Sequence, residues 1–416
     1  MTAAVPRPPQ APSTPARQAP PGPALIEVLT RAAGHGSPAA FELDGRPMTL
    51  VTDPEQVRQV LACRPEVYVK HSHRARALLG DGLITATGDA WKRQRRLLQA
   101  RFTVTGVRRY EAGIAAAAER IARRWSAAAG TGDLVDVGED MRFFALDTIW
   151  RALTGDPLDE AAHRELAAVD TVVAALPTTA GAPTGDPAEV GAALGRIDAT
   201  ARRVIAAARA RRAAHGPSDA LLDLLLDASG SDAGDPDRLV RDELVTLLVA
   251  GHETTAQTLA WLFLMLHQNI HVPRTSEPGA LVAETLRLYP AVWLVPRCAA
   301  RDDVLGGRRV AAGSGVLVCP YLTHREPAWW PDPERFDPAR FLPGGVRPAH
   351  PGAYVPFGLG PRACLGQQFA LRETAALLAR LLPAFTVELR DPPAAPVFGA
   401  NLRPGGPLPA VVRRRT

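Results

Sequence analysis

Cysteine is scarce in this chain, and the few cysteines lie far apart. The sequence of 416 residues has four of them, Cys63, Cys298, Cys319 and Cys364. No two form a C-x-x-C pair, which excludes a zinc site built on paired thiolates. Four cysteines in so long a chain also exclude a disulfide scaffold. This usage predicts a reducing compartment, and we expect a cytoplasmic protein.

Long apolar runs are absent as well. The N-terminal segment MTAAVPRPPQAPSTPARQAPPGPALIEVLT lacks the apolar core of a signal peptide, and no stretch is long enough to span a bilayer. We therefore expect no membrane anchor. The prolines of this segment predict a disordered leader over residues 1–24. Because no second linker and no internal repeat follow, residues 25–416 are expected to form a single domain.

The chain has only a modest excess of positive charge, and its arginines are spread along the sequence. Lys and Arg number 48 against 43 Asp and Glu, and the net charge is +5. A basic tail of the kind that binds nucleic acid is limited to Arg413, Arg414 and Arg415. Nucleic-acid binding is therefore not expected.

What the chain does contain is a series of helical patterns, with only short strand-like runs between them. We predict a mainly α protein with small β-sheets. The predicted helices are Asp89–Phe102, Val107–Ala128, Pro187–His215, Asp237–Gln268, Glu277–Leu288 and Gln367–Leu382, and the predicted strands are Thr49–Val51, Gly315–Val318 and Thr386–Leu389. The loop Leu176–Asp186, rich in Pro, Gly and Thr, is either a mobile lid or an ordinary connector.

The first chemical motif is PFGLGPRACLGQQF, residues 356–369, around Cys364. Two glycines and a proline ahead of the cysteine predict a tight loop, and a helix begins just after it. Helix N-terminal amides favour an anion, so they lower the pKa of a thiol. A thiolate held in this way can ligate a metal, and Gly366 would let a flat ligand approach closely. Taken alone, such a cysteine can also be a buried structural residue.

The second motif is AGHETT, residues 250–255, inside the predicted helix Asp237–Gln268. That helix is apolar on nearly every side, so we expect it to run through a core. Burying Glu253 there is costly unless the carboxylate has a partner or a task. Gly251 weakens the helix, and a threonine hydroxyl can bond to the carbonyl one turn back and bend it. The motif is therefore either a kink in a core helix or a functional site.

The first motif resembles the haem-loop signature of the cytochrome P-450 family of haem-thiolate monooxygenases, in its soluble bacterial form. The resemblance covers about residues 25–416 and implies that family's fold, a triangular helical prism. Haem b would lie between the central oxygen-binding helix and the helix after the cysteine. Cys364 would be the proximal ligand of the iron. The resemblance also implies that Arg362 contacts a haem propionate, and that the cofactor is flanked by Phe357, Gly358 and Gly366.

The second motif is similar to that family's oxygen-binding helix. There an acid and an alcohol, here Glu253 and Thr254, relay protons to dioxygen. Ala250 and Gly251 would leave room above the iron.

Further haem contacts follow from the resemblance. Trp91 and Arg95 match a W-x-x-x-R signature that grips a propionate, and Arg297 matches another propionate contact. Without the resemblance, Trp91 would equally suit a surface helix with a half-buried ring.

Glu284 and Arg287 lie three residues apart on one helical face, which alone is usually a surface ion pair of little worth. The resemblance adds Arg335, from the segment PDPERF, and implies a buried network of these three behind the haem loop. In that family the network serves haem incorporation, and the resemblance implies the same role here. His324 is given a structural role.

The substrate pocket implied by the resemblance is mostly apolar. It would draw on the loop around His73–Ile84 and on six further residues: Leu248, Val249, Val292, Trp293, Leu294 and Phe398. Such a lining predicts an apolar or amphipathic substrate, for example a terpene, a polyketide or another secondary metabolite.

The implied reaction is oxygen activation, in which RH, O2, two electrons and two protons give ROH and water by hydroxylation, or an epoxide is formed. Electrons would come from an acidic ferredoxin or flavodoxin with its NAD(P)H reductase, docking on a basic face around Lys92 and Arg96. We expect a monomer. A peroxide-driven or non-oxygenating enzyme, or a haem sensor without turnover, is the alternative. The pair Glu253–Thr254 argues against a peroxide-driven enzyme, which needs no proton relay.

Overall fold

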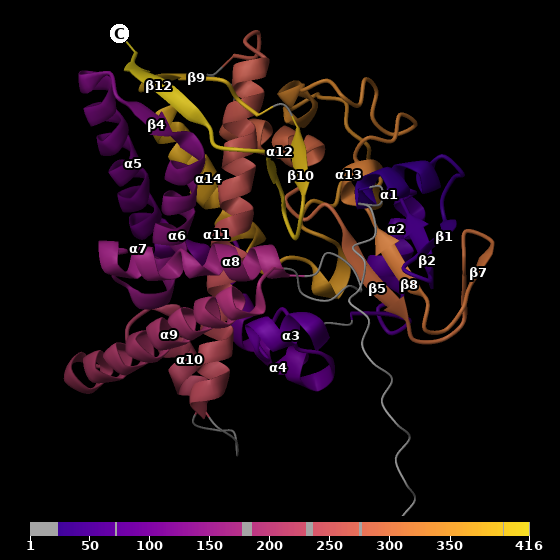
Figure 1. The fold of residues 1–416 in the computed structure, drawn as a ribbon, viewed down its shortest axis with the longest axis horizontal. Coiled ribbons are helices and arrows are strands. Elements are labelled where there is room, and N and C mark those ends of the chain that lie inside the picture. Colours follow the sequence, from indigo (N-terminus) through magenta and orange to yellow (C-terminus); the bar gives the residue numbers. More distant parts are fainter. Residues whose placement is uncertain are drawn as a thin grey trace, which may run out of the picture.

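The computed structural model of this protein describes residues 24–70, 73–176, 185–229, 236–273, 277–393 and 395–415. The predicted leader and most of the predicted lid lie outside these ranges. Helices dominate the described part, and small sheets accompany them (Figure 1). The predicted class, mainly α with small β-sheets, is confirmed.

Helices form the framework of the described chain. In chain order the α-helices are α1 (Leu25–Ala33), α2 (Pro54–Arg58), α3 (His73–Leu79), α4 (Gly88–Gln99), α5 (Glu111–Thr131), α6 (Val137–Thr154), α7 (Glu160–Leu166), α8 (Ala168–Ala175), α9 (Pro187–His215), α10 (Leu221–Ser229), α11 (Pro236–Gln268), α12 (Pro278–Leu288), α13 (Pro320–Thr323) and α14 (Gln367–Leu381). A π-helical turn η1 (Gln59–Cys63) and five 3₁₀ segments join them, η2 (Ala100–Phe102), η3 (Gly106–Tyr110), η4 (Pro338–Phe341), η5 (Pro351–Ala353) and η6 (Gly360–Arg362).

The strands of the described residues form small, separate sheets. They are β1 (Ala39–Leu43), β2 (Arg46–Val51), β3 (Tyr68–Val69), β4 (Leu134–Asp136), β5 (Val295–Ala299), β6 (Asp303–Leu305), β7 (Arg308–Val310), β8 (Gly315–Val318), β9 (Phe385–Leu389), β10 (Pro396–Phe398), β11 (Leu402–Pro404) and β12 (Pro409–Arg414). One sheet has the order β1–β2–β8–β5–β3 and another β4–β12–β9, while β6–β7 and β10–β11 are ribbons. Only β2 and β8 pair in parallel, with Leu50 opposite Leu317; the other described pairs are antiparallel.

The helix boundaries follow capping chemistry that is readable in the sequence. α9 spans the predicted range because the carboxylate of Asp186 accepts from the N–H of Ala188, and Pro187 occupies the first turn. Gly216, with φ of 79°, follows its last residue. The predicted helix Asp89–Phe102 is instead α4 followed by η2, and Val107–Ala128 is η3 followed by α5. Both differences are 3₁₀ turns at helix ends, where such turns are frequent.

The longest helix, α11, runs through the middle of the molecule, with α6 and α12 packed against it (Figure 1). Its residues Leu259, Leu262 and Phe263 are buried. Trp125 of α5 meets the ring of Phe263 edge-on, with centroids 5.5 Å apart, and meets Phe385 of β9 in the same way. The predicted core helix is therefore confirmed, and it ties the helices to the β4–β12–β9 sheet.

Candidate active site

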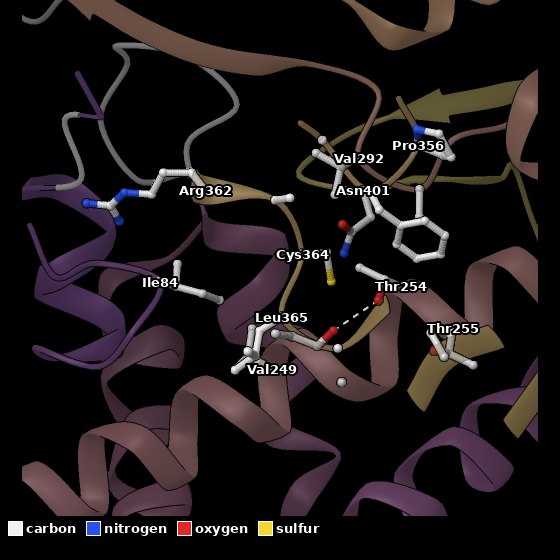
Figure 2. Close-up of a pocket in the computed structure, with 18 of the residues that line it drawn as sticks. Ile84, Val249, Thr254, Thr255, Val292, Pro356, Arg362, Cys364, Leu365 and Asn401 are labelled. Atoms are coloured by element: carbon white, nitrogen blue, oxygen red, sulfur yellow. Dashed lines mark hydrogen bonds between the residues drawn. The ribbon is translucent and has the colours of Figure 1, made fainter. Parts of the chain in front are cut away.

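A cavity of about 510 Å³ lies between the middle of α11 and the loop that precedes α14 (Figure 2). Residues of α3, α4 and β5 line its other sides. The α11 lining recurs at helical spacing and consists chiefly of Leu247, Ala250, Gly251, Thr254, Thr255 and Thr258. One side of the central helix therefore faces the cysteine loop across the cavity.

The loop before α14 positions Cys364 through backbone geometry. Gly358 and Gly360 have φ of 72° and 74°, a left-handed conformation that favours glycine. A Cβ on Gly360 would lie 2.4 Å from the carbonyl oxygen of Leu61, so close packing also requires glycine there. The N–H of Cys364 donates to the carbonyl of Phe357 at 2.8 Å. The sulfur of Cys364 points into the cavity (Figure 2).

The pKa of the Cys364 thiol is under opposing influences. Burial raises it, whereas the N–H groups of Gly366 and Gln367 and the guanidinium of Arg95 lower it. Burial is the largest influence, so the pKa lies above its ordinary value. The amides at the helix start lower the pKa, as predicted, but desolvation outweighs them. A metal cation at the sulfur would supply the missing stabilisation of the thiolate.

Four cationic side chains line the same cavity: Lys70, Arg95, Arg297 and Arg362. Burial lowers the pKa of Lys70 to about 8 and those of Arg297 and Arg362 to about 10. Within the described ranges no carboxylate contributes to the pKa of any of the four. Partly buried cations without counter-ions suit an anionic ligand. A haem, with two propionates and an apolar body, fits these residues and the nearby thiol.

Two of these arginines also join the cysteine loop to α4. The guanidinium of Arg362 lies over the ring of Trp91, 4.1 Å from its centroid, and donates to the carbonyl of Ala86 at 3.0 Å. Arg95 donates to the carbonyl of Ala363 at 2.9 Å, next to the cysteine. These contacts hold the loop and α4 together at one end of the cavity.

The structure gathers the residues predicted to contact haem around this one cavity. Its lining includes all of them: Trp91, Arg95, Ala250, Gly251, Arg297, Phe357, Gly358, Arg362, Cys364 and Gly366. Lys70 was not predicted, because it belongs to no motif and its only signal is its positive charge.

The small residues of α11 have different functions from one another. A Cβ on Gly251 would lie 2.9 Å from the side chain of Ile149, so this glycine lets α6 pack against α11. Gly251 also lines the cavity. Ala250 faces the cavity, and its carbonyl accepts a hydrogen bond from the hydroxyl of Thr254 at 2.9 Å (Figure 2). This is the predicted bond to the carbonyl one turn back.

Glu253 does not line the cavity, although it was predicted to act with Thr254. It is 7% exposed, and its Oε1 accepts from Nε2 of Gln257 at 2.8 Å. Its Oε2 lies 3.9 Å from Nε2 of His252 and 4.0 Å from Nε of Arg142 on α6. Successive helical residues differ by about 100° in direction, so the acid and the alcohol face different sides of α11.

Four of the six residues named for the predicted substrate pocket line this cavity. Val249, Val292, Trp293 and Leu294 line the cavity, as do Leu79 and Ile84 from the predicted loop. Leu248 does not line it, because it lies on another face of α11. Phe398 packs behind Trp293, with ring centroids 5.0 Å apart, and does not line the cavity either.

Glu373 of α14 is a fully buried acid that the sequence reading did not single out. The hydroxyl of Thr255 donates to its Oε1 at 2.8 Å, and that of Thr148 donates to its Oε2. Burial raises the pKa of Glu373 to about 8. The side chain is therefore mostly neutral at pH 7 and cross-links α14 to α6 and α11 beside the cavity. A polar residue in the second turn of a core helix is the signal that could have found it.

The predicted ion pair is buried completely. Glu284 and Arg287 are both 0% exposed, and the guanidinium donates to the two carboxylate oxygens at 2.7 and 2.8 Å. Arg287 also donates to the carbonyl of Arg335 at 2.9 Å. The side chain of Arg335 is exposed, so the prediction that it completes the network is wrong. The third member of the network is Arg340, whose Nε lies 3.6 Å from Glu284.

His324 belongs to the same buried region. Its Nε2 accepts from the N–H of Val355 at 2.9 Å, and its Nδ1 lies 3.2 Å from the carbonyl of Arg287. Burial lowers the pKa of His324 to about 3, so the ring is neutral. These contacts support the predicted structural role.

Comparison with known proteins identifies the class of protein. Residues 31–275 and 279–401 match the family described as cytochrome P-450. The chain belongs to the cytochrome P-450 family, and it is a monooxygenase, an oxidoreductase that uses haem iron and O2.

Among curated relatives, the chain is similar to two proteins of Streptomyces melanosporofaciens. One is cyclooctatin synthase, 31% identical over 91% of this chain and 87% of the relative. The other is cyclooctat-9-en-7-ol 5-monooxygenase, 31% identical over 94% and 91%. Pentalenene oxygenase of Streptomyces avermitilis is 28% identical over 87% of this chain and 86% of its own.

Solved structures show the same architecture. The haem domain of cytochrome P450DA superposes with a TM-score of 0.81 at 26% identity, covering 94% of this chain and 93% of that one. A six-coordinated cytochrome P-450 of Thermus thermophilus gives a TM-score of 0.73 at 32% identity, covering 94% and 98%. In the described part of the chain, no helix combines the length and apolar character needed to cross a membrane.

Proposed function

We propose that this monooxygenase hydroxylates or epoxidises an apolar terpene-like secondary metabolite. The observation that supports this most is the apolar lining of the cavity beside Thr254, which includes Ile84, Leu247, Val249 and Leu294. Such a lining binds a hydrocarbon skeleton and offers few polar groups. Two relatives carry substrate names of that kind, pentalenene and cyclooctat-9-en-7-ol.

The proposal assigns the cofactor to the residues already described. Cys364 would be the iron ligand of a haem b, and Lys70, Arg95, Arg297 and Arg362 would hold the propionates of that haem. When bound, the haem supplies the chemistry of oxygen activation. The chain's own residues hold the thiolate, neutralise the propionates and exclude water from the reacting face. The proposal includes a single domain over residues 25–416, a monomeric state and a cytoplasmic location.

Proton supply is assigned to α11. The Thr254 hydroxyl lies in the cavity, where it can donate a hydrogen bond to dioxygen. It can then regain a proton from Glu253. Glu253 brings protons from the opposite side of the helix, where Arg142 and His252 surround it. A rotation of the Glu253 side chain carries the proton between the two faces.

Substrate class can be tested by the change in the Soret absorption of the haem-loaded protein when ligands enter the cavity. Terpene hydrocarbons and their mono-alcohols are expected to give saturable shifts, whereas sugars and amino acids give none. Val249→Phe should weaken the terpene response by about tenfold or more, because one added ring overpacks the cavity. Val304→Phe, on the exposed strand β6, is the matched control and should leave it unchanged. Responses confined to polar ligands would contradict the proposal.

Thr254→Ala should bind haem and substrate normally yet lose product. The coupled rate is expected to fall by about 10²-fold, since a proton-transfer group is removed. Reducing equivalents should then appear as hydrogen peroxide, which is measured against product formed. The matched control is Thr285→Ala. It removes a hydroxyl that makes the same bond to a carbonyl one turn back, but away from the cavity. Full coupling in Thr254→Ala would place the relay elsewhere.

The electron donor is proposed to be an acidic ferredoxin or flavodoxin with its NAD(P)H reductase. Lys92 and Arg96 are exposed on α4, the helix that contacts the cysteine loop. Lys92→Glu with Arg96→Glu should slow ferredoxin-driven reduction severalfold at low salt, and less at high salt because of screening. Arg413→Glu, on β12 far from α4 in Figure 1, is the control. Stopped-flow reduction that is equally fast in both would contradict this docking face.

A further inference from the structure

Three polar side chains converge on the side of α11 that faces away from the cavity. Nε2 of His252 lies 3.6 Å from Oδ1 of Asp170 on α8 and 3.9 Å from Oε2 of Glu253. The three atoms all lie within 4.8 Å of one another. His252 is 1% exposed and Glu253 7%, so the cluster is inside the protein. The Asp170 side chain is 42% exposed, so the cluster can be reached from solvent.

The facing atoms of this cluster are two carboxylate oxygens and one imidazole nitrogen. Nδ1 of His252 lies 2.8 Å from the carbonyl of Leu248, which can only accept, so Nδ1 donates to that carbonyl and Nε2 is the nitrogen that faces the two carboxylates. Among the described residues, Oδ1 of Asp170 and Oε2 of Glu253 are buried without a hydrogen-bond partner. A cation can satisfy all three.

The local charge balance also favours a bound cation. Nε of Arg142 lies 3.5 Å from the other oxygen of Asp170, Oδ2, and its guanidinium also donates to Glu139 at 2.6 Å. Three carboxylates around one guanidinium leave two negative charges uncompensated. Burial lowers the pKa of the nearby His163, which keeps that ring neutral. A divalent cation would make the group neutral, and Arg142 would hold Asp170 in place from behind.

We propose that Asp170, His252 and Glu253 bind a divalent transition-metal cation such as Zn²⁺. One imidazole nitrogen and two carboxylate oxygens are a common ligand set for Zn²⁺, with water as a fourth ligand. The bond from Nδ1 to the Leu248 carbonyl is the support that a metal-ligating histidine usually has. The imidazole disfavours Mg²⁺ and Ca²⁺, which prefer oxygen ligands only.

Occupancy of this cation site would fix Glu253 on the side of α11 away from the cavity. Since Glu253 is also the proposed proton carrier, bound Zn²⁺ would slow proton supply. That consequence rests on the proposed function, whereas the binding of the cation does not. The test therefore measures binding directly and without turnover.

The experiment is calorimetric titration of Zn²⁺ into the haem-loaded full chain carrying Cys63→Ser, which removes an exposed thiol. One equivalent is expected to bind, and Mg²⁺ should give no saturable signal. His252→Gln and Asp170→Asn should each weaken Zn²⁺ binding by at least about tenfold. The matched control is His350→Gln, which removes a surface imidazole 3.2 Å from Glu55 and should change nothing.

X-ray absorption of the zinc-loaded parent keeps the test independent of any variant that folds poorly. A first shell of nitrogen and oxygen without sulfur is the expected result. A sulfur shell, a parent that binds no Zn²⁺, or binding retained in both His252→Gln and Asp170→Asn would overturn the proposal.

Discussion

Cys364→Ser is expected to lose all monooxygenase activity. A serine hydroxyl is neutral at working pH and is a hard, weakly basic ligand, so it cannot replace the thiolate as the donor that favours O–O cleavage. The loop itself should survive, because the N–H of residue 364 still donates to the carbonyl of Phe357 and both glycines remain. The loss should therefore be chemical and not a failure to fold.

The measurement is oxygen-dependent product formation with a saturating electron donor, together with thermal unfolding of the same sample. Cys298→Ser is the matched control, since Cys298 lies on β5 outside the cavity lining. It should retain activity. Product formation by Cys364→Ser at the rate of the control would rule out Cys364 as the iron ligand.

Arg287→Met should be the most destabilising change outside the cavity. It leaves the carboxylate of Glu284 buried without its partner and deprives the carbonyls of His324, Pro333 and Arg335 of a donor. Removing one member of a buried pair costs about 3–5 kcal/mol. Urea unfolding should show that loss, and the fraction of purified chains that contain haem should fall with it.

The control for this change is Arg58→Met. Arg58 also pairs with an acid three residues away, Glu55, but both side chains are largely exposed. No measurable change in stability or haem content is expected there. Equal effects of the two substitutions would show that the Glu284–Arg287 pair is an ordinary surface pair in energetic terms.

The cysteine loop and the central helix could be predicted because their chemistry is local. Gly358 and Gly360 with positive φ, Cys364 and the helix start at Gln367 lie within one short segment, so their spacing in sequence fixes their spacing in space. The same holds for Thr254, whose hydroxyl bonds within its own helix. For these elements the sequence pattern and the structure agree.

The wrong assignments concern directions that depend on distant parts of the chain. Leu248 was assigned to the cavity although the lining of α11 repeats from Leu247 to Ala250, Thr254 and Thr258. The direction of each side chain around α11 could have been predicted from the sequence, since a step of one residue turns a side chain by about 100°. The sequence could not show that Arg340, and not Arg335, lies beside Glu284, because the irregular segment around the two arginines has no periodicity.

Other features could not be predicted from sequence at all. Lys70 reaches the cavity only because β3 pairs with β5, which places it near Arg297. The cluster of Asp170, His252 and Glu253 requires α8 to cross α11, a contact between segments about 80 residues apart in the chain. Such long-range packing is set by the whole core and not by a local pattern.

The central claim is that the thiolate of Cys364 holds the haem iron, and the absorption spectrum of the reduced carbon-monoxide complex tests it most directly. The wild-type chain is predicted to show the far red-shifted Soret band of thiolate ligation, and Cys364→Ser is predicted to lose it. A band at the position given by a nitrogen or oxygen ligand in the wild type, or the same thiolate band in both proteins, would contradict the account.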